Sequence, residues 1–147
     1  MPRGSRRIVL ERLPDAPPMA VPSRATAGSA CFDLAAAESV DLERGRVTLV
    51  RTGFKMRCPP ATFLEVRPRS GLATRGVLMA NAPGTIDADY SGEVCVPLTY
   101  LGDGRYHIEV GDRIAQVRLV EDVPSSFELG SVTTVPSRRG GFGSTGR

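Results

Sequence analysis

Proline occurs at twelve positions in this chain of 147 residues and constrains the fold more than any other feature. A proline inside a helix removes a backbone donor and clashes with the preceding turn, so long helices are excluded from nearly every window. The remaining windows hold short runs in which apolar and polar residues alternate between turn residues. This pattern predicts an all-β protein, a barrel or sandwich of many short strands.

The alternation predicts strands over residues 7–12, 46–56, 62–66, 77–80, 93–100, 105–110 and 113–120. Pro97 interrupts one of these runs, which favours an edge position or a bulge there. One short helix is expected over residues 70–75, with Ser70 as its N-cap.

The length of the chain fits one domain that buries about two-thirds of its unfolded surface. We expect a single β-barrel domain over residues 1–136 and a mobile glycine-rich arm over residues 137–147. No apolar run reaches the roughly 20 residues that span a bilayer. The first residues also lack the apolar segment of a signal peptide, so a cytoplasmic protein is the default expectation.

Cysteine and histidine usage excludes a histidine-rich metal site, an H-E-x-x-H motif and a nucleophile activated by histidine. Cys31, Cys58 and Cys95 are widely spaced among apolar or small residues, and His107 is the only histidine. The cysteines are typical of small buried hydrophobes in a reducing compartment, with a redox or metal role as the less common alternative. Hydrolysis by such a chain would need a carboxylate base, hydrogen-bond donors and a hard, oxygen-bound cation.

The basic residues are almost all arginine, with Lys55 as the single lysine, and the formal net charge is +3. Arginine suits planar, bidentate recognition of phosphate, although codon composition produces the same bias. The pI near 9.1 keeps nucleic acid among the possible partners. The basic residues are scattered and aromatic content is 5%, so no basic stacking platform is visible.

Residues 81–93, N-A-P-G-T-I-D-A-D-Y-S-G-E, place two carboxylates and one aromatic ring between turn residues. Asp87, Asp89 and Tyr90 are poor choices for a strand core, and flanking glycines let the backbone approach a ligand closely. Taken alone, the stretch fits a binding hairpin or an ordinary solvated surface hairpin equally well.

Two further stretches could hold phosphate. In P-R-S-G-L-A, Arg69 and the Ser70 hydroxyl stand at a strand-to-helix junction, where they could bind phosphate. A capped helix with solvent-facing arginines would have the same sequence pattern. The tail S-R-R-G-G-F-G-S-T-G-R offers glycine backbone donors, hydroxyls, arginines and the ring of Phe142. A flexible solubilising terminus is the alternative for the tail.

Two polar residues stand in apolar strand contexts. Asp33, beside Cys31 and Phe32, is costly to bury unless it pairs with arginine, accepts hydrogen bonds or binds a cation through water, and pairing is the commoner solution. Gln116, at the end of G-D-R-I-A-Q, lies opposite Val117 in the strand pattern, where it could reach a ligand, although the stretch also fits a tight turn plus strand.

Together these stretches resemble a known family. The chain contains, in the order and approximate spacing of the five motifs of the homotrimeric dUTP pyrophosphatase (dUTPase) family, the stretches A-G-S-A-C-F-D-L-A-A, P-R-S-G-L-A, G-T-I-D-A-D-Y-S-G-E, G-D-R-I-A-Q and G-G-F-G-S-T-G. The resemblance implies a distorted jelly-roll-like β-barrel and a homotrimer with active sites at subunit boundaries. It also implies Mg²⁺-assisted hydrolysis of dUTP to dUMP and pyrophosphate, which limits uracil incorporation into DNA and supplies dUMP for thymidylate synthesis.

The resemblance assigns the hairpin to the nucleoside and the catalytic water. Asp87 would be the general base that deprotonates the water attacking the α-phosphorus. Tyr90 would lie against deoxyribose and leave no room for a 2′-hydroxyl. The residues that would meet uracil, at its edge or from beneath, are Asn81, Gly84, Thr85, Ile86 and Cys95.

The other motifs would hold the triphosphate, while Asp33 would bind a water of the Mg²⁺ ion and Phe142 would stack on uracil. The residues assigned to the phosphates are Arg69, Ser70, Gly71, Gln116, Arg138, Gly143, Ser144 and Thr145. Ser137 stands where the family has an arginine, so either Arg138 or Arg139 would supply that charge.

Alternative functions stay open at this point. A dCTP deaminase resembles this fold and trimer, although the sequence has no segment matching its glutamate-bearing insertion. A non-catalytic trimer on the same scaffold and a nucleic-acid-binding module are the others. The partners expected are dUTP and further copies of the chain, with no stable nucleic acid and no membrane.

Overall fold

The computed structural model describes residues 6–132, which form two four-stranded sheets, one two-stranded sheet and one short helix. The first sheet contains, in spatial order, β1 (Val9–Arg12), β4 (Thr48–Arg57), β8 (Glu93–Tyr100) and β6 (Val77–Met79). The second contains β2 (Phe32–Ala35), β10 (Arg113–Glu121), β5 (Thr62–Arg67) and β7 (Gly84–Ile86). The small sheet pairs β3 (Val40–Glu43) with β9 (Arg105–Ile108), and the helix α1 spans Ser70–Ala73.

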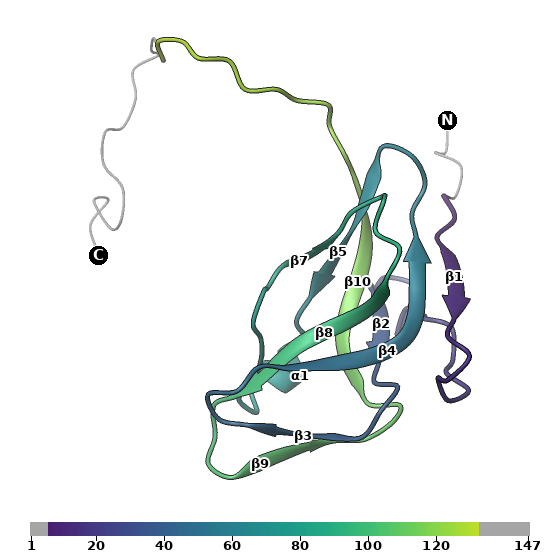
Figure 1. The fold of residues 1–147 in the computed structure, drawn as a ribbon, viewed down its shortest axis with the longest axis vertical. Coiled ribbons are helices and arrows are strands. Elements are labelled where there is room, and N and C mark those ends of the chain that lie inside the picture. Colours follow the sequence, from purple (N-terminus) through teal and green to yellow (C-terminus); the bar gives the residue numbers. More distant parts are fainter. Residues whose placement is uncertain (1–5, 133–147) are drawn as a thin grey trace.

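The two larger sheets enclose a single apolar core. Figure 1 shows β4 and β8 lying in front of β5 and β10, with β3 and β9 below them. Alternate residues of β8 point inward, so Val94, Val96 and Leu98 are buried while the residues between them are partly exposed. The all-β prediction is therefore confirmed. Within residues 6–132 the sheets do not close into a barrel, and the arrangement is a sandwich.

Strand positions follow the alternating pattern closely where the runs are long. The runs predicted for β4, β8 and β10 are found within two residues of their expected ends. The pattern does not predict β3, because four residues carry too few alternations to separate a strand from a loop. β3 forms because its whole length pairs with β9, from Val40 opposite Ile108 to Glu43 opposite Arg105.

Pro97 lies in an interior strand, so its predicted edge position is wrong. β8 is flanked by β4 and β6, and the register shift in the β4–β8 pairing falls between Arg51 and Lys55 rather than at Pro97. The carbonyl of Pro97 accepts a bond of 2.9 Å from Ala80, which follows β6. In an antiparallel pair the N and C=O of one residue face the same neighbour, so the missing donor faces the chain where β6 has already ended.

The helix α1 is shorter than expected, and its predicted N-cap is wrong. Ser70 is already helical, and the N-cap is Arg69, whose extended backbone (φ −100°, ψ 131°) is not capped by a side chain. Leu72 packs against the core. The helix therefore serves mainly to turn the chain from β5 towards β6.

The cysteines are all free thiols. Cys31 and Cys58 are buried, as predicted, and Cys95 is partly buried. The Cys58 thiol donates to the carbonyl of Thr62. None of the helices in the described range is long and apolar enough to cross a membrane.

After β10 the chain leaves the sheets as an extended segment, residues 122–132, which we call the C-terminal extension. Figure 1 shows it running away from the sheets. Four apolar side chains on it are at least 74% exposed: Val123, Phe127, Leu129 and Val132.

Candidate active site

Three motifs that are far apart in the sequence meet in one small cleft of about 170 Å³. We call it the arginine cleft. β2 contributes Asp33, β10 contributes Gln116, and the junction between β5 and α1 contributes the remaining motif residues. The full lining is Ala25, Ser29, Cys31, Asp33, Arg69, Ser70, Gly71 and Gln116.

The carboxylate of Asp33 lies between two guanidinium groups. Arg69 donates through Nε to one oxygen at 3.1 Å, and Arg113 lies 3.4 Å from the other. The Asp33 side chain is only 19% exposed, so these ion pairs compensate for the removal of its charge from water. Of the solutions that the sequence left open for this partly buried acid, pairing with arginine is the one present.

The same contacts fix the phosphate-binding candidates relative to one another. Arg69 also donates to the backbone carbonyl of Arg113 at 3.1 Å. Gln116 lies opposite Asp33 in the β2–β10 pairing, and its amide donates to the carbonyl of Pro68 at 2.9 Å, which holds the turn before α1. A guanidinium has five N–H donors and these contacts use two, so Arg69 keeps donors for an anion.

The hairpin of residues 81–93 has its two arms in different sheets. β7 pairs with β5, whereas β8 pairs with β4 and β6. The arms therefore separate instead of pairing with each other, and β7 lies at the edge of its sheet, with one side unpaired within the described residues. Gly84 is buried at this point, and a Cβ there would lie 3.2 Å from the Asn81 side-chain nitrogen, so a larger residue would have to displace that side chain slightly.

Tyr90 is held by the base of the hairpin. Its hydroxyl donates to the carbonyl of Glu93 at 2.9 Å, and its ring covers Gly92. A Cβ at position 92 would come within 2.5 Å of the Tyr90 oxygen, so glycine is required for the ring to take this place. The ring remains 45% exposed.

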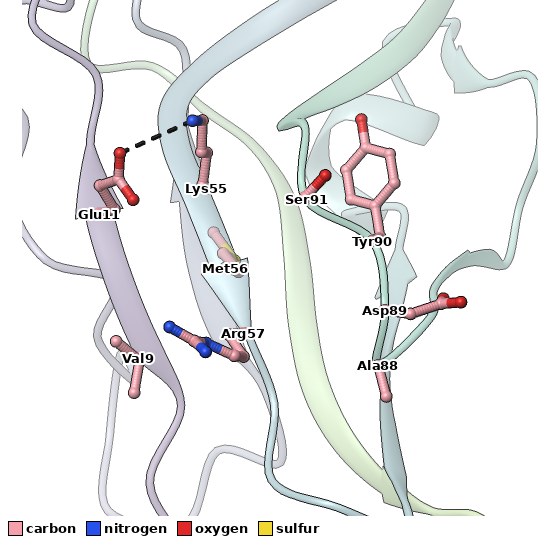
Figure 2. Close-up of a pocket in the computed structure, with 9 residues that line it drawn as sticks. All are labelled: Val9, Glu11, Lys55, Met56, Arg57, Ala88, Asp89, Tyr90 and Ser91. Carbon is pink, nitrogen blue, oxygen red and sulfur yellow. Dashed lines mark ion pairs between the residues drawn. The ribbon is translucent and has the colours of Figure 1, made fainter.

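Tyr90 also lines a cavity of about 470 Å³. Figure 2 shows it between the hairpin on one side and β1 and β4 on the other, with Glu11 paired to Lys55. Asp89 is exposed, and its side chain points away from β4 in this view.

Asp87 is exposed at the start of the hairpin turn, where its carbonyl accepts a bond of 3.1 Å from the Tyr90 amide. No hairpin residue lines the arginine cleft within the part of the chain described. Figure 1 shows the turn joining β7 to β8 near the upper end of the sheets and α1 lower down. The structure thus brings the site candidates together as two separate groups.

Comparison with known proteins decides between the families that share this fold. The dUTPase family model matches residues 18–146. The chain belongs to the dUTPase family. A relative from Anaeromyxobacter sp. (strain Fw109-5), named deoxyuridine 5′-triphosphate nucleotidohydrolase, is 47% identical over 142 residues, covering 89% of this chain and 90% of its own. A relative of the same name from Beijerinckia indica is 43% identical over 146 residues, covering 95% and 91% of the two chains.

Solved structures agree with the family assignment. The dUTPase of Streptococcus mutans is 26% identical, with a TM-score of 0.75 over 80% of this chain and 98% of that one. A mutant dUTPase of Staphylococcus bacteriophage 80alpha with dUpNHpp is 23% identical, with a TM-score of 0.77 over 95% and 99%. The second likeness concerns the fold alone.

In this dUTPase family member, the predicted tail residues lie outside the described range: Arg138, Arg139, Phe142, Gly143, Ser144 and Thr145. Cys95 lies in β8 with its pKa raised, first by burial and then by the nearby Glu93 carboxylate, so the thiol stays neutral.

The sequence analysis did not identify Arg113, Arg51 or Glu93 as residues of either group. Arg113 stands within the motif G-D-R-I-A-Q, which could have pointed to it. Arg51 and Glu93 are 42 positions apart, and no local pattern indicates that they pair.

The described residues fit a magnesium ion only if it is held mainly by substrate phosphates and by its own waters. Among the described residues, no three His, Cys, Asp or Glu side chains gather to hold a metal ion. The Asp33 carboxylate has accepting capacity left beside its two arginines. Mg²⁺ keeps several waters and is commonly bound through substrate phosphates, so one carboxylate that accepts from a metal-bound water is chemically sufficient.

Proposed function

We propose that this protein hydrolyses dUTP to dUMP and pyrophosphate, a reaction that limits uracil incorporation into DNA and supplies dUMP for thymidylate synthesis. The observation that carries the proposal is the arginine cleft, in which three of the family's motifs meet, with Arg69 bonded to Asp33 and Gln116 bonded to the carbonyl of Pro68. The names of the curated relatives support the same substrate.

Phosphoanhydride hydrolysis needs a positioned water and neutralised charge more than a side-chain nucleophile. We assign the triphosphate to the side chains of Arg69, Ser70 and Gln116 and to the backbone of Gly71. Asp87 is assigned as the general base for the water that attacks the α-phosphorus, because its carboxylate is exposed at the hairpin and lacks the arginine partners that Asp33 has.

The nucleoside is assigned to the hairpin. Uracil presents donors and acceptors along one planar edge, and the separated arms of β7 and β8 offer backbone groups of the matching kind. Thr85 and Ile86 lie on one arm and Cys95 on the other. Asn81 and Gly84 precede them, and Tyr90 is assigned to the deoxyribose, where its ring leaves no space for a 2′-hydroxyl.

A homotrimer with shared active sites is part of this proposal. The base and the phosphate ligands do not line one cleft within a single described chain, so a second copy is needed to bring them together. The C-terminal extension supports association as well, because Phe127 and Leu129 are fully exposed and a copy of the chain could cover them. Closed rings of identical subunits satisfy such head-to-tail contacts.

Mg²⁺ is proposed as the cofactor, held by the triphosphate with Asp33 accepting from one of its waters. When bound, it would neutralise charge on the phosphates. A related phage dUTPase structure is described as coordinating a structural Mg(II) ion, although the likeness to it concerns the fold alone.

The remaining assignments concern residues outside the described range. We propose one domain over residues 1–136 and a glycine-rich arm over residues 137–147 that closes on the bound nucleotide. Phe142 would stack on uracil, and the β- and γ-phosphates would meet Arg138 or Arg139, Gly143, Ser144 and Thr145. The protein is proposed to act in the cytoplasm.

A panel of deoxynucleoside and ribonucleoside triphosphates with Mg²⁺, assayed for pyrophosphate release, tests the proposal. Release from dUTP well above release from dCTP, dTTP and UTP is expected. Ammonia release from dCTP at a comparable rate would instead identify a deaminase. Binding of DNA without any turnover of dUTP would exclude the enzyme altogether.

A further inference from the structure

An ion pair at the base of the hairpin links two strands. Arg51 of β4 donates through Nε to both carboxylate oxygens of Glu93, at 3.2 and 3.0 Å. The amide of Gly53 donates to the same carboxylate at 2.8 Å. The Glu93 side chain is only 17% exposed and that of Arg51 31%, so the pair is largely shielded from water. This arrangement favours one fixed geometry over a loose surface contact.

The backbone ladder is irregular where this pair lies. Arg51 faces Cys95 and Lys55 faces Glu93, with a register shift between them. A shift of this kind leaves residues without regular ladder bonds and bends the strand. The carboxylate bonds from Arg51 and Gly53 therefore replace ladder bonds and hold the first residue of β8 in position.

Glu93 holds Tyr90 through a different group of the same residue. Its carboxylate binds Arg51, whereas its backbone carbonyl accepts the Tyr90 hydroxyl at 2.9 Å. The path from Arg51 to the aromatic ring contains no flexible segment longer than the Glu93 side chain. A displacement of Glu93 would move the anchor of the ring.

We propose that Arg51 and Glu93 are positioning residues that fix the ring of Tyr90 and thereby set the preference for deoxyribose over ribose. The inference rests on the proposed function. Steric rejection of one hydroxyl requires that the ring cannot yield, and small displacements of a positioning group have large effects on reactive complexes. Arg51 and Glu93 need not touch the substrate to have this effect.

The structure offers a matched control on the same guanidinium. Asp15, in the loop between β1 and β2, accepts from Nη2 of Arg51 at 3.1 and 3.0 Å, and its side chain is 68% exposed. Asp15→Asn and Glu93→Gln each neutralise one carboxylate partner of Arg51. Only Glu93 also contacts Tyr90, so only Glu93→Gln is expected to alter sugar discrimination.

The experiment measures kcat and KM for dUTP and UTP in the full-length protein. For Glu93→Gln and Arg51→Met, the ratio of kcat/KM for dUTP to that for UTP is expected to fall about tenfold, mainly through faster use of UTP. Arg51→Lys should restore part of the ratio, and Asp15→Asn should keep the wild-type value. Discrimination unchanged in folded Glu93→Gln and Arg51→Met proteins would overturn the proposal.

Tyr90→Phe keeps the proposal testable if the ion-pair variants do not fold. It removes only the hydroxyl bond to Glu93, and a similar loss of discrimination is expected. Because both changes act on one link, the double variant with Glu93→Gln should lose no more than either single variant. Full discrimination by Tyr90→Phe, or additive losses, would contradict the proposed link. A wild-type protein that releases no pyrophosphate from dUTP would overturn the proposed function, and the inference with it.

Discussion

The arginine cleft and the hairpin differ in how completely one chain builds them. In the arginine cleft, Asp33 is shielded and bonded to two arginines, and Gln116 holds the adjacent turn. In the hairpin, Asp87 and Tyr90 are exposed, and the facing backbone edges of β7 and β8 do not pair with each other. The first region is organised by contacts within one chain, whereas the second leaves its groups exposed, for a ligand and, in the proposed trimer, another subunit to complete.

Because of this difference, we expect substitutions in the two regions to have different effects on stability and turnover. A change in the arginine cleft breaks contacts that the folded chain uses itself, so it should affect stability and binding together. A change at the exposed Asp87 side chain breaks no such contact, so it should affect turnover alone. Each of the following variants tests one side of that contrast.

Asp87→Asn has the largest expected effect. Loss of the general base should lower kcat by about 10²- to 10⁴-fold with little change in dUTP affinity or melting temperature, because the side chain is exposed. Steady-state kinetics, ligand titration and thermal unfolding check the three parts. Asp89→Asn is the matched control two residues away and should keep near wild-type turnover. Retained activity in Asp87→Asn would remove its assigned role.

Arg69→Met should affect both stability and function. It leaves the shielded Asp33 carboxylate with one arginine instead of two, which should lower the free energy of unfolding by about 1–3 kcal/mol. It should also raise KM for dUTP. Arg44→Met, which breaks an exposed pair with Asp103, is the control and should change neither quantity measurably. A loss of activity without any loss of stability would contradict the view that this cleft is held by its own ion pairs.

Tyr90→Ala should relax the rejection of UTP by about 10- to 100-fold, since the ring that blocks the 2′-hydroxyl is gone. Its stability should change less than that of Arg69→Met, because the ring is half exposed. Competition between dUTP and UTP in one reaction measures the ratio directly. If the variant still excludes UTP as strongly as the wild type, the ring does not select the sugar.

His107→Gln has the smallest expected effect and supplies a reference outside both regions. Its hydrogen bond to Asp41, 2.7 Å long, raises the pKa of His107 and lowers that of Asp41. A raised folded pKa stabilises below the unfolded value of 6.5 and is lost as pH rises through the folded value. The lowered Asp41 pKa stabilises above 3.8 and is lost as pH falls through its folded value.

The stability difference between wild type and His107→Gln should therefore be greatest between about pH 3.8 and 6.5 and shrink at higher pH. Chemical denaturation at several pH values measures it. Because β3 and β9 carry this pair away from both site regions, the pH dependence of turnover should not change. A shifted pH–rate profile would show that the small sheet is coupled to catalysis.

The sequence predicted most of the framework because long alternating runs leave few other choices. β8 and β10 follow from their period of two, and motif order predicted that Arg69 and Gln116 belong to one site. Local patterns could not predict contacts between distant positions. Ser70 has the chemistry of an N-cap, but in the structure it is the first helical residue and Arg69 is the N-cap.

The other errors share that cause. Pro97 is tolerated in an interior strand only because β6 ends at Met79, which a pattern within β8 does not reveal. The Arg51–Glu93 pair depends on a register shift between β4 and β8, and β3 depends on its pairing with β9. Tertiary pairing decided each of these, and no single stretch of sequence contains it.

The most direct test of the central claim is complementation between two impaired variants, assayed at a dUTP concentration well below the raised KM of Arg69→Met. Asp87→Asn and Arg69→Met chains with different affinity tags would be co-expressed, and trimers carrying both tags purified and assayed with dUTP. If the hairpin of one subunit meets the arginine cleft of another, each mixed ring contains one intact boundary, and activity should return to about one-third of wild type. Mixed trimers no more active than the parent variants would place both groups in one subunit and contradict the account.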